Sequence, residues 1–240
     1  MTVTVVLVHG AFHGGWCWDR IVPGLTGAGL TPVVVDLPGH GVGDPGPVGD
    51  LSDDAAHVRA VLDGCAGPVL LVGHSYGGAV ITEAAAGRAD VGHLVYLAAM
   101  VPDVGETIGG ASAGVDPGAA SMTITTAFVP AADGATVRVA DHAVREIFYH
   151  DCADADVEFA RARLSPQSTA SFAATLTGAA WRDVPSTYVL CTDDRTVPVP
   201  VQEANAGRTG ATVTLPTSHS PFFSAPDDLV DVLVAIARTI

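Results

Sequence analysis

The chain has 240 residues, of which 48% are hydrophobic, and its 26 acidic and 11 basic residues give a formal net charge of −15. This length and composition predict one compact domain with a sizeable core. All basic residues are arginines, and the negative charge argues against a nucleic-acid or anionic-membrane partner, because no basic patch is available to replace counterions.

The cysteines are isolated from one another and form no CxxC pair and no zinc-type spacing with histidine; they are Cys17, Cys65, Cys152 and Cys191. We therefore expect reduced thiols and no metal site. No glycine-rich dinucleotide fingerprint follows a predicted strand, so we expect no cofactor. The N-terminus carries no basic leader, and no apolar run approaches the ~20 residues of a membrane span. These features predict a cytoplasmic protein without a membrane partner.

Short β-branched runs alternate with helical patterns, which is typical of a parallel sheet with crossover helices. The strands are continuous apolar runs, as expected where both faces of a sheet are covered. They are predicted at residues 3–9, 31–37, 68–73, 93–99, 186–191 and 211–216. The helices are predicted at residues 18–28, 52–64, 78–87, 200–207 and 226–238. Ser52, followed by two aspartates, is the predicted N-cap of the second helix.

Residues 101–180 interrupt this alternation. The segment opens with a loop rich in Gly, Ala, Ser and Pro at 105–121, and continues with amphipathic helical patterns at 141–150 and 154–164. A disordered linker would fit only the first third. We predict an insertion over one end of the sheet, so that residues 1–100 and 181–240 form the core. Its ten acidic residues against four arginines disfavour anionic substrates.

The predicted strand at 68–73 runs into GHSYG, residues 73–77, and then into a helix. A G-x-S-x-G nucleophile elbow requires this strand–turn–helix context, because small residues let the chain turn sharply and lift the serine hydroxyl above the sheet. The alternative is that Ser75 is only a small residue in a tight turn. The context favours Ser75 as a nucleophile.

A serine hydroxyl is a weak nucleophile until a base takes its proton and a third group holds that base. In this architecture the acid and then the histidine follow the serine, each after a later strand. His219 follows the last predicted strand and is the candidate base. Asp193 and Asp194 both follow the preceding strand; we favour Asp194, which reaches the loop crest that must meet His219.

An oxyanion hole in this architecture uses the backbone N–H after the nucleophile and a second N–H from the loop after the first core strand. Tyr76 supplies the first, and Ala11, in the glycine-rich loop, is our candidate for the second. Further residues are predicted near the substrate pocket: Gly10, Phe12, His13 and His150.

Five segments together resemble the α/β-hydrolase superfamily. In chain order, LVHGAFHGGWCW, DLPGHG, LVGHSYGG, CTDDRTVP and SHSPFFSAPDDL are similar to its oxyanion loop, early sheet turn, elbow, acid loop and histidine loop. The resemblance covers nearly the whole chain. It implies an α/β-hydrolase fold of about six mainly parallel strands flanked by helices, with a helical cap insertion at 101–180. It also implies Ser75 as nucleophile, His219 as base and Asp194 as its orienter.

HGAFHGGW, FYHDC and CTDDRTVP are similar to the branch that holds plant methyl-ester hydrolases, hydroxynitrile lyases and bacterial relatives. The implied activity is hydrolysis of a small to medium, largely apolar neutral carboxylic ester through an acyl-enzyme. A hydroxynitrile lyase and a non-catalytic ligand receptor are the alternatives. Lyases of this branch have a lysine after the histidine and a threonine in the oxyanion loop, where this chain has Ser220 and Gly10. Both departures favour ester hydrolysis.

Overall fold

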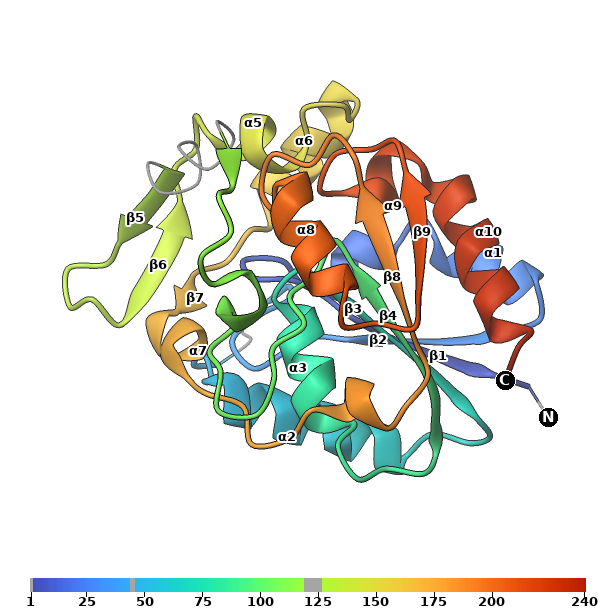
Figure 1. The fold of residues 1–240 in the computed structure, drawn as a ribbon. Helices are drawn as coiled ribbons and strands as arrows, with labels where there is room; N and C mark the ends of the chain where they lie inside the picture. Colours follow the sequence, from blue (N-terminus) through green and yellow to red (C-terminus); the bar gives the residue numbers. More distant parts are fainter. Residues whose placement is uncertain (1, 44–45, 119–126) are drawn as a thin grey trace.

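The computed structural model describes residues 2–43, 46–118 and 127–240 (Figure 1). A six-stranded parallel sheet with strand order β2-β1-β3-β4-β8-β9 forms the centre of this part of the chain. In chain order its strands are β1 (Thr4–Val8), β2 (Thr31–Val35), β3 (Val69–His74), β4 (Val91–Leu97), β8 (Ser186–Cys191) and β9 (Ala211–Leu215). Each lies within two residues of its predicted range, and the predicted fold class is confirmed.

The sheet separates two hydrophobic cores, because successive side chains of a strand point to opposite faces. In β1, Val5 and Leu7 lie in one core, and Val6 and Val8 lie in the other. The helices that cover the sheet are α1 (Val22–Gly27), α2 (Leu51–Asp63), α3 (Gly77–Ala84), α8 (Val199–Ala206) and α10 (Pro226–Ala237). Residues of α1 and α10 join the first core, and residues of α2, α3 and α8 join the second.

The start of α2 differs from the prediction. Its N-cap is Asp50, whose Oδ1 accepts hydrogen bonds from the N–H groups of Ser52 and Asp53 at 2.8 and 3.1 Å. The Asp53 carboxylate accepts in return from the Asp50 N–H at 3.1 Å, which completes a capping box. The prediction of Ser52 as the N-cap is wrong, because the Asp50 carboxylate already takes these amide hydrogen bonds.

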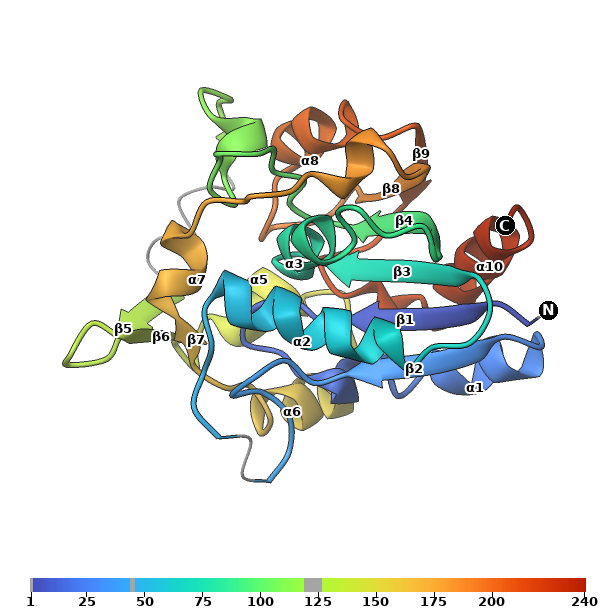
Figure 2. The same ribbon diagram turned by 90° about the horizontal axis from the view of Figure 1, so that it is seen from below.

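The arrows of β1 and β3 point toward the elements that lie between β4 and β8 (Figure 2). We keep residues 101–180 as the proposed extent of this region and call it the cap. Residues 119–126 of its predicted loop lie outside the described residues. The described helices of the cap are η2 (Gly110–Ser112), α5 (Val144–Phe148), α6 (Asp154–Arg161), α7 (Thr169–Ala173) and the start of η4 (Ala180–Arg182).

The cap is not only helical. A three-stranded antiparallel sheet joins β5 (Phe128–Pro130), β6 (Thr136–Val139) and β7 (Gln167–Ser168). Strands of two to four residues are too short to show an alternating pattern, which explains why the sequence did not predict them. The remaining short helices, η1 (Gly15–Trp18) and α9 (Pro221–Ser224), belong to the core. Among the helices of the described ranges, none combines the length and apolar character needed to cross a membrane.

Candidate active site

Ser75 lies between the end of β3 and the start of α3, at the edge of the sheet that faces the cap. Its φ of +54° is in the left-handed region, which a residue other than glycine adopts only when its surroundings hold it there. A Cβ atom on Gly77 would stand 2.6 Å from the carbonyl oxygen of His9, so the turn requires glycine at this position. The backbone therefore has the sharp, strained form of a nucleophile elbow.

His219 and Asp194 form a buried pair. The Nδ1 atom of His219 lies 2.7 Å from Oδ2 of Asp194, and the two side chains are 1% and 0% exposed. A carboxylate only accepts hydrogen bonds, so Nδ1 of His219 is the donor in this contact. Oδ1 of Asp194 accepts from the N–H groups of Thr196 and Val197 at 2.6 and 2.9 Å. This loop holds the carboxylate in place.

The structure brings Asp194, and not Asp193, against His219. Asp193 is exposed, whereas Asp194 is buried. The Asp193 N–H donates to the carbonyl of Thr217 at 3.0 Å, and this bond joins the loop after β8 to the loop after β9. The two adjacent carboxylates therefore have different environments.

His74 connects the elbow to the histidine loop. Its Nε2 lies 2.9 Å from the carbonyl oxygen of His219, and the two rings are 4.5 Å apart between centroids. Because a carbonyl only accepts, Nε2 of His74 carries the proton. Burial holds the pKa of His74 well below its usual value, so its ring is neutral.

The Ser75 hydroxyl makes no hydrogen bond within the described part of the chain. In enzymes without bound substrate, the hydrogen bond between a nucleophile and its base is often long.

Two residues at the cavity of Ser75 have a backbone amide without a hydrogen-bond partner among the described residues. Ala11 and Tyr76 line the same cavity as Ser75. Neither amide donates a hydrogen bond to another group of the described residues. Free, fixed N–H groups next to a nucleophile are what an oxyanion hole requires.

The cavity at Ser75 has a volume of about 250 Å³ and is strongly apolar. Its lining residues come from both the core and the cap; they are Ala11, Phe12, Ser75, Tyr76, Met100, Ile108, Phe128, Phe148, Phe172 and Thr196. No carboxylate, guanidinium or imidazole is among them. The ring of Phe12 lies within 6.4 Å of three cap rings, those of Phe128, Phe148 and Phe172, between centroids.

Of the residues predicted near the pocket, the structure places Phe12 in the cavity lining and Gly10, His13 and His150 outside it. Gly10 lies behind Ser75, because a Cβ atom there would stand 2.8 Å from the Cβ of Ser75. His13 is buried and supports the loop: its Nδ1 donates to the carbonyl of Ala11 at 2.8 Å. Burial lowers the pKa of His13 to about 3. The Nε2 of His150 lies 2.8 Å from the carbonyl oxygen of Asp193.

The aromatic lining supplied by the cap was missed in the sequence. Phe128 comes from β5, Phe148 from the end of α5 and Phe172 from α7. Of the three, only Phe148 belongs to a segment with a family resemblance, FYHDC. Nothing in the sequence indicates that the three rings lie together. Their meeting depends on how the cap folds.

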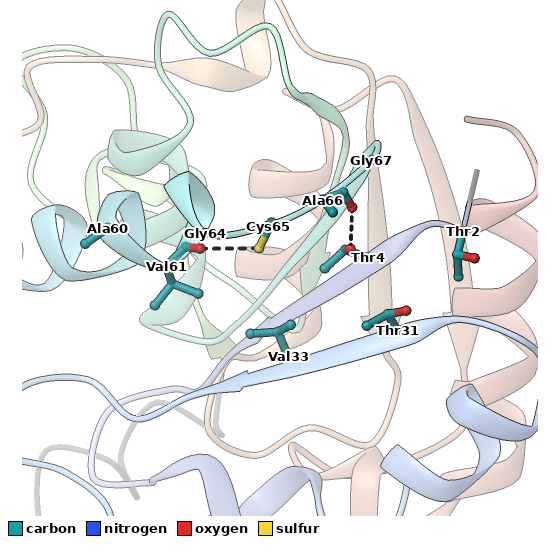
Figure 3. Close-up of a pocket in the computed structure, with 10 residues that line it drawn as sticks. All are labelled: Thr2, Thr4, Thr31, Val33, Ala60, Val61, Gly64, Cys65, Ala66 and Gly67. Carbon is teal, nitrogen blue, oxygen red and sulfur yellow. Dashed lines mark hydrogen bonds between the residues drawn. The ribbon is translucent and has the colours of Figure 1, made fainter.

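A larger hollow of about 710 Å³ lies at the opposite ends of the strands (Figure 3). It is lined by Thr2, Thr4, Thr31, Val33, Ala60, Val61, Gly64, Cys65, Ala66 and Gly67. Its one titratable side chain is Cys65, whose thiol donates to the carbonyl of Val61 at 3.3 Å. Without a base or an acid this hollow offers no hydrolytic chemistry, so the smaller cavity is the candidate active site.

In the ranges that the structure describes, no group of His, Cys, Asp and Glu could hold a metal ion.

The sheet order and the strained serine after its central strand define the class of α/β hydrolases. Comparison with known families matches residues 5–232 to the family described as "Alpha/beta hydrolase family". The match covers most of the 240 residues. This chain belongs to the alpha/beta hydrolase family.

Relatives of the predicted branch are among the proteins similar to this chain. A pyrethroid hydrolase from Sphingobium wenxiniae is 31% identical over 250 residues, which cover 99% of this chain and 89% of the relative. Methylesterase 18 from Arabidopsis thaliana is 29% identical over 255 residues, which cover 98% of this chain and 97% of the relative. The crystal structure of a pyrethroid hydrolase from Sphingobium faniae has a TM-score of 0.88 at 28% identity, over 99% of this chain and 98% of that one. The predicted branch is confirmed, as is the enzyme class, a carboxylic ester hydrolase.

Proposed function

We propose that this chain hydrolyses small to medium, largely apolar neutral carboxylic esters through an acyl-enzyme formed on Ser75. One observation carries the proposal. Ser75 lies in a strained turn beside two free amides at an apolar cavity, and His74 joins that turn to the loop that carries the buried His219–Asp194 pair. These contacts support a nucleophile, a base with its orienter and an oxyanion site at the same end of the sheet.

In the proposed reaction, Oγ of Ser75 attacks the ester carbonyl carbon while Nε2 of His219 takes the hydroxyl proton. The carbonyl oxygen becomes negative and accepts hydrogen bonds from the N–H groups of Ala11 and Tyr76. Asp194 stabilises the imidazolium. The tetrahedral intermediate collapses, and His219 gives its proton to the departing alkoxide. A water molecule, deprotonated by His219, then attacks the acyl-enzyme and releases the carboxylic acid.

The cavity supports an uncharged substrate. Among the described residues its lining is mainly aromatic and aliphatic and has no ionised group, so a charged substituent would lose its hydration without gaining a partner there. The excess of acidic residues in the cap repels anions further. Relatives named as a pyrethroid hydrolase and a methylesterase also support an ester substrate.

Two positions argue against a hydroxynitrile lyase. A side chain at Gly10 would begin 2.8 Å from the Cβ of Ser75 and 2.9 Å from Nδ1 of His74, so the threonine of the lyases has no room here. Ser220 follows His219, and the sequence contains no lysine to stabilise a developing cyanide anion. Both observations favour attack on an ester carbonyl.

Purified protein tests the proposal with two substrates. We expect it to hydrolyse p-nitrophenyl or phenyl acetate and to release no cyanide from mandelonitrile above the buffer rate. Efficient cyanide release without esterase activity would establish the lyase. If a fluorophosphonate probe labels Ser75 but a broad panel of esters is not turned over, the chain is a ligand receptor and the proposed function is wrong.

A further inference from the structure

The segment FYHDC, residues 148–152, begins at the last residue of α5 and ends before α6. It contacts both loops that carry the proposed base and its orienter. The Nε2–H of His150 donates to the carbonyl of Asp193 at 2.8 Å, and Asp193 directly precedes Asp194. Oδ2 of Asp151 accepts from the N–H of Ser218 at 2.7 Å, and Ser218 directly precedes His219. Two adjacent cap residues thus hold the two residues that come immediately before the His–Asp pair.

Further contacts surround this pair of hydrogen bonds. The ring of Phe148 stacks on the imidazole of His219, with 5.8 Å between centroids and 27° between planes. The carbonyl of Phe148 accepts from the hydroxyl of Ser218 at 3.3 Å. The hydroxyl of Thr196, in the acid loop, donates to the carbonyl of Ile147 at 2.6 Å. The end of α5 therefore contacts both loops closely.

Asp151 is suited to hold a backbone amide. Burial works to raise its pKa, but the hydrogen bonds from Ser218, Cys152 and Ser224 together outweigh that effect and hold the pKa of this carboxyl below its usual value. An ionised carboxylate accepts hydrogen bonds only, and a charged acceptor makes a stronger bond to an N–H than a neutral one. Its contact with the histidine loop is the shortest that this segment makes to either loop through a side chain of its own.

We infer that Asp151, assisted by His150, is a positioning residue for the His219–Asp194 pair, acting from the cap through the backbone of Ser218. The inference rests on the proposed function. The His219–Asp194 pair needs the loop after β8 and the loop after β9 at a fixed separation. A misplacement of about 1 Å at a catalytic group costs on the order of 100-fold in rate. The cap then has two tasks: its phenylalanines line the cavity, and its 148–152 segment sets the geometry of the base.

Asp151→Ala and Asp151→Asn test this role, with Asp154→Ala as the matched control. Asp154 lies two residues after this segment, at the start of α6, and its side chain is 95% exposed and pairs with Arg145. We expect Asp151→Ala to lower kcat on p-nitrophenyl acetate, per titrated active site, by about 10- to 100-fold, with KM changed by less than about threefold. Asp151→Asn keeps an oxygen that accepts the Ser218 N–H and recovers most of the rate. Asp154→Ala has the rate of the parent protein.

A spectroscopic readout follows the geometry without turnover. The proton between Nδ1 of His219 and Asp194 gives a far-downfield NMR resonance, which we expect to shift or broaden in Asp151→Ala and to stay in Asp154→Ala. His150→Ala is the second variant; it removes the donor to Asp193 from a partly exposed position and is expected to lower kcat in the same direction.

Three outcomes would overturn the inference. The first is an unchanged kcat and resonance in Asp151→Ala. The second is a smaller fraction of titratable sites with unchanged kcat per site, which shows a purely structural role. The third concerns His150→Ala and applies if Asp151→Ala does not fold. In that case a His150→Ala protein with the kcat and the NMR resonance of the parent protein would overturn the inference. If the parent protein itself lacks esterase activity, the proposed function fails, and the resonance still decides whether residues 148–152 position the pair.

Discussion

Asp194 and Asp193 are adjacent in the chain, but their carboxylates lie in very different environments. The Asp194 side chain is buried and accepts hydrogen bonds from His219, from two backbone amides and, at 3.4 Å, from the side-chain amide of Gln202. The Asp193 residue is exposed and contributes its backbone instead. At the residue scale, burial and hydrogen bonding decide which carboxylate can orient the imidazole.

Asp194→Asn is predicted to lower kcat by on the order of 10⁴, because the amide cannot hold the imidazole in the required tautomer. Asp193→Asn is predicted to cost little, since its side chain faces solvent. Steady-state kinetics on p-nitrophenyl acetate compare the two variants, and circular dichroism checks that both fold. The opposite ranking would move the orienting role to Asp193.

Sequence could select Ser75 and His219 as candidates because each lies in a short linear motif after a strand. It could only favour Asp194, because which of two adjacent side chains turns inward depends on the loop that wraps the carboxylate. The aromatic lining of the cavity could not be predicted from the sequence. Phe128, Phe148 and Phe172 are separated by at least 20 positions each, and only the folded cap brings them together.

At the scale of elements, the core was easier to predict than the cap. The core strands are continuous apolar runs, and a run that is buried on both faces is visible without knowledge of its neighbours. The cap sheet is made of strands of two to four residues whose pairing defines them. The start of α2 was misplaced by a similar cause, because Ser52 and Asp50 are both good N-caps and only geometry selects Asp50.

The capping box of α2 leads to a stability prediction. Asp50→Ala removes the acceptor for two amide N–H groups and is predicted to lower the free energy of unfolding by about 1 kcal/mol. Urea denaturation at constant pH measures it. Asp50→Ser keeps a capping oxygen and serves as the control, which should retain most of the stability. Equal losses in the two variants would show that capping is not the cause.

At the scale of the whole molecule, the most unusual feature is a group of buried histidines near the oxyanion loop: His9, His13, His40 and His74. Burial lowers the pKa of His13 to about 3 and that of His40 to about 4, and it holds the pKa of His9 and His74 well below the usual value. All four are neutral in the folded state at neutral pH. The interior of the molecule therefore depends on imidazoles that must stay uncharged.

We expect this protein to unfold at mildly acidic pH. Above about pH 6.5 these histidines are neutral in both states; below it only the unfolded chain takes up protons, so the free energy of unfolding falls. Burial raises the pKa of Asp54 to about 7, which opposes one histidine, because the folded state then binds a proton as pH falls. For these five groups the slope approaches about 4 kcal/mol per pH unit once the histidines of the unfolded chain are protonated, against a typical total stability of about 5–15 kcal/mol.

We predict that far-ultraviolet circular dichroism shows cooperative loss of structure on acidification to about pH 5. His40→Gln removes one of the buried imidazoles and should make the dependence on pH shallower. A fold that is equally stable at about pH 7 and about pH 4 would contradict the assignment of neutral, proton-excluding histidines to the core.

In the proposed reaction, Ser75 carries the acyl group during ester hydrolysis. Rapid mixing with p-nitrophenyl acetate, followed by acid quenching and mass spectrometry of the digested protein, measures this directly. We predict an acetyl group on the peptide that contains Ser75, and in Ser75→Ala we predict no acetylated peptide and a kcat lower by several orders of magnitude with the fold intact. Acetylation of a different residue, or a Ser75→Ala rate above about a tenth of that of the parent protein, would contradict the account.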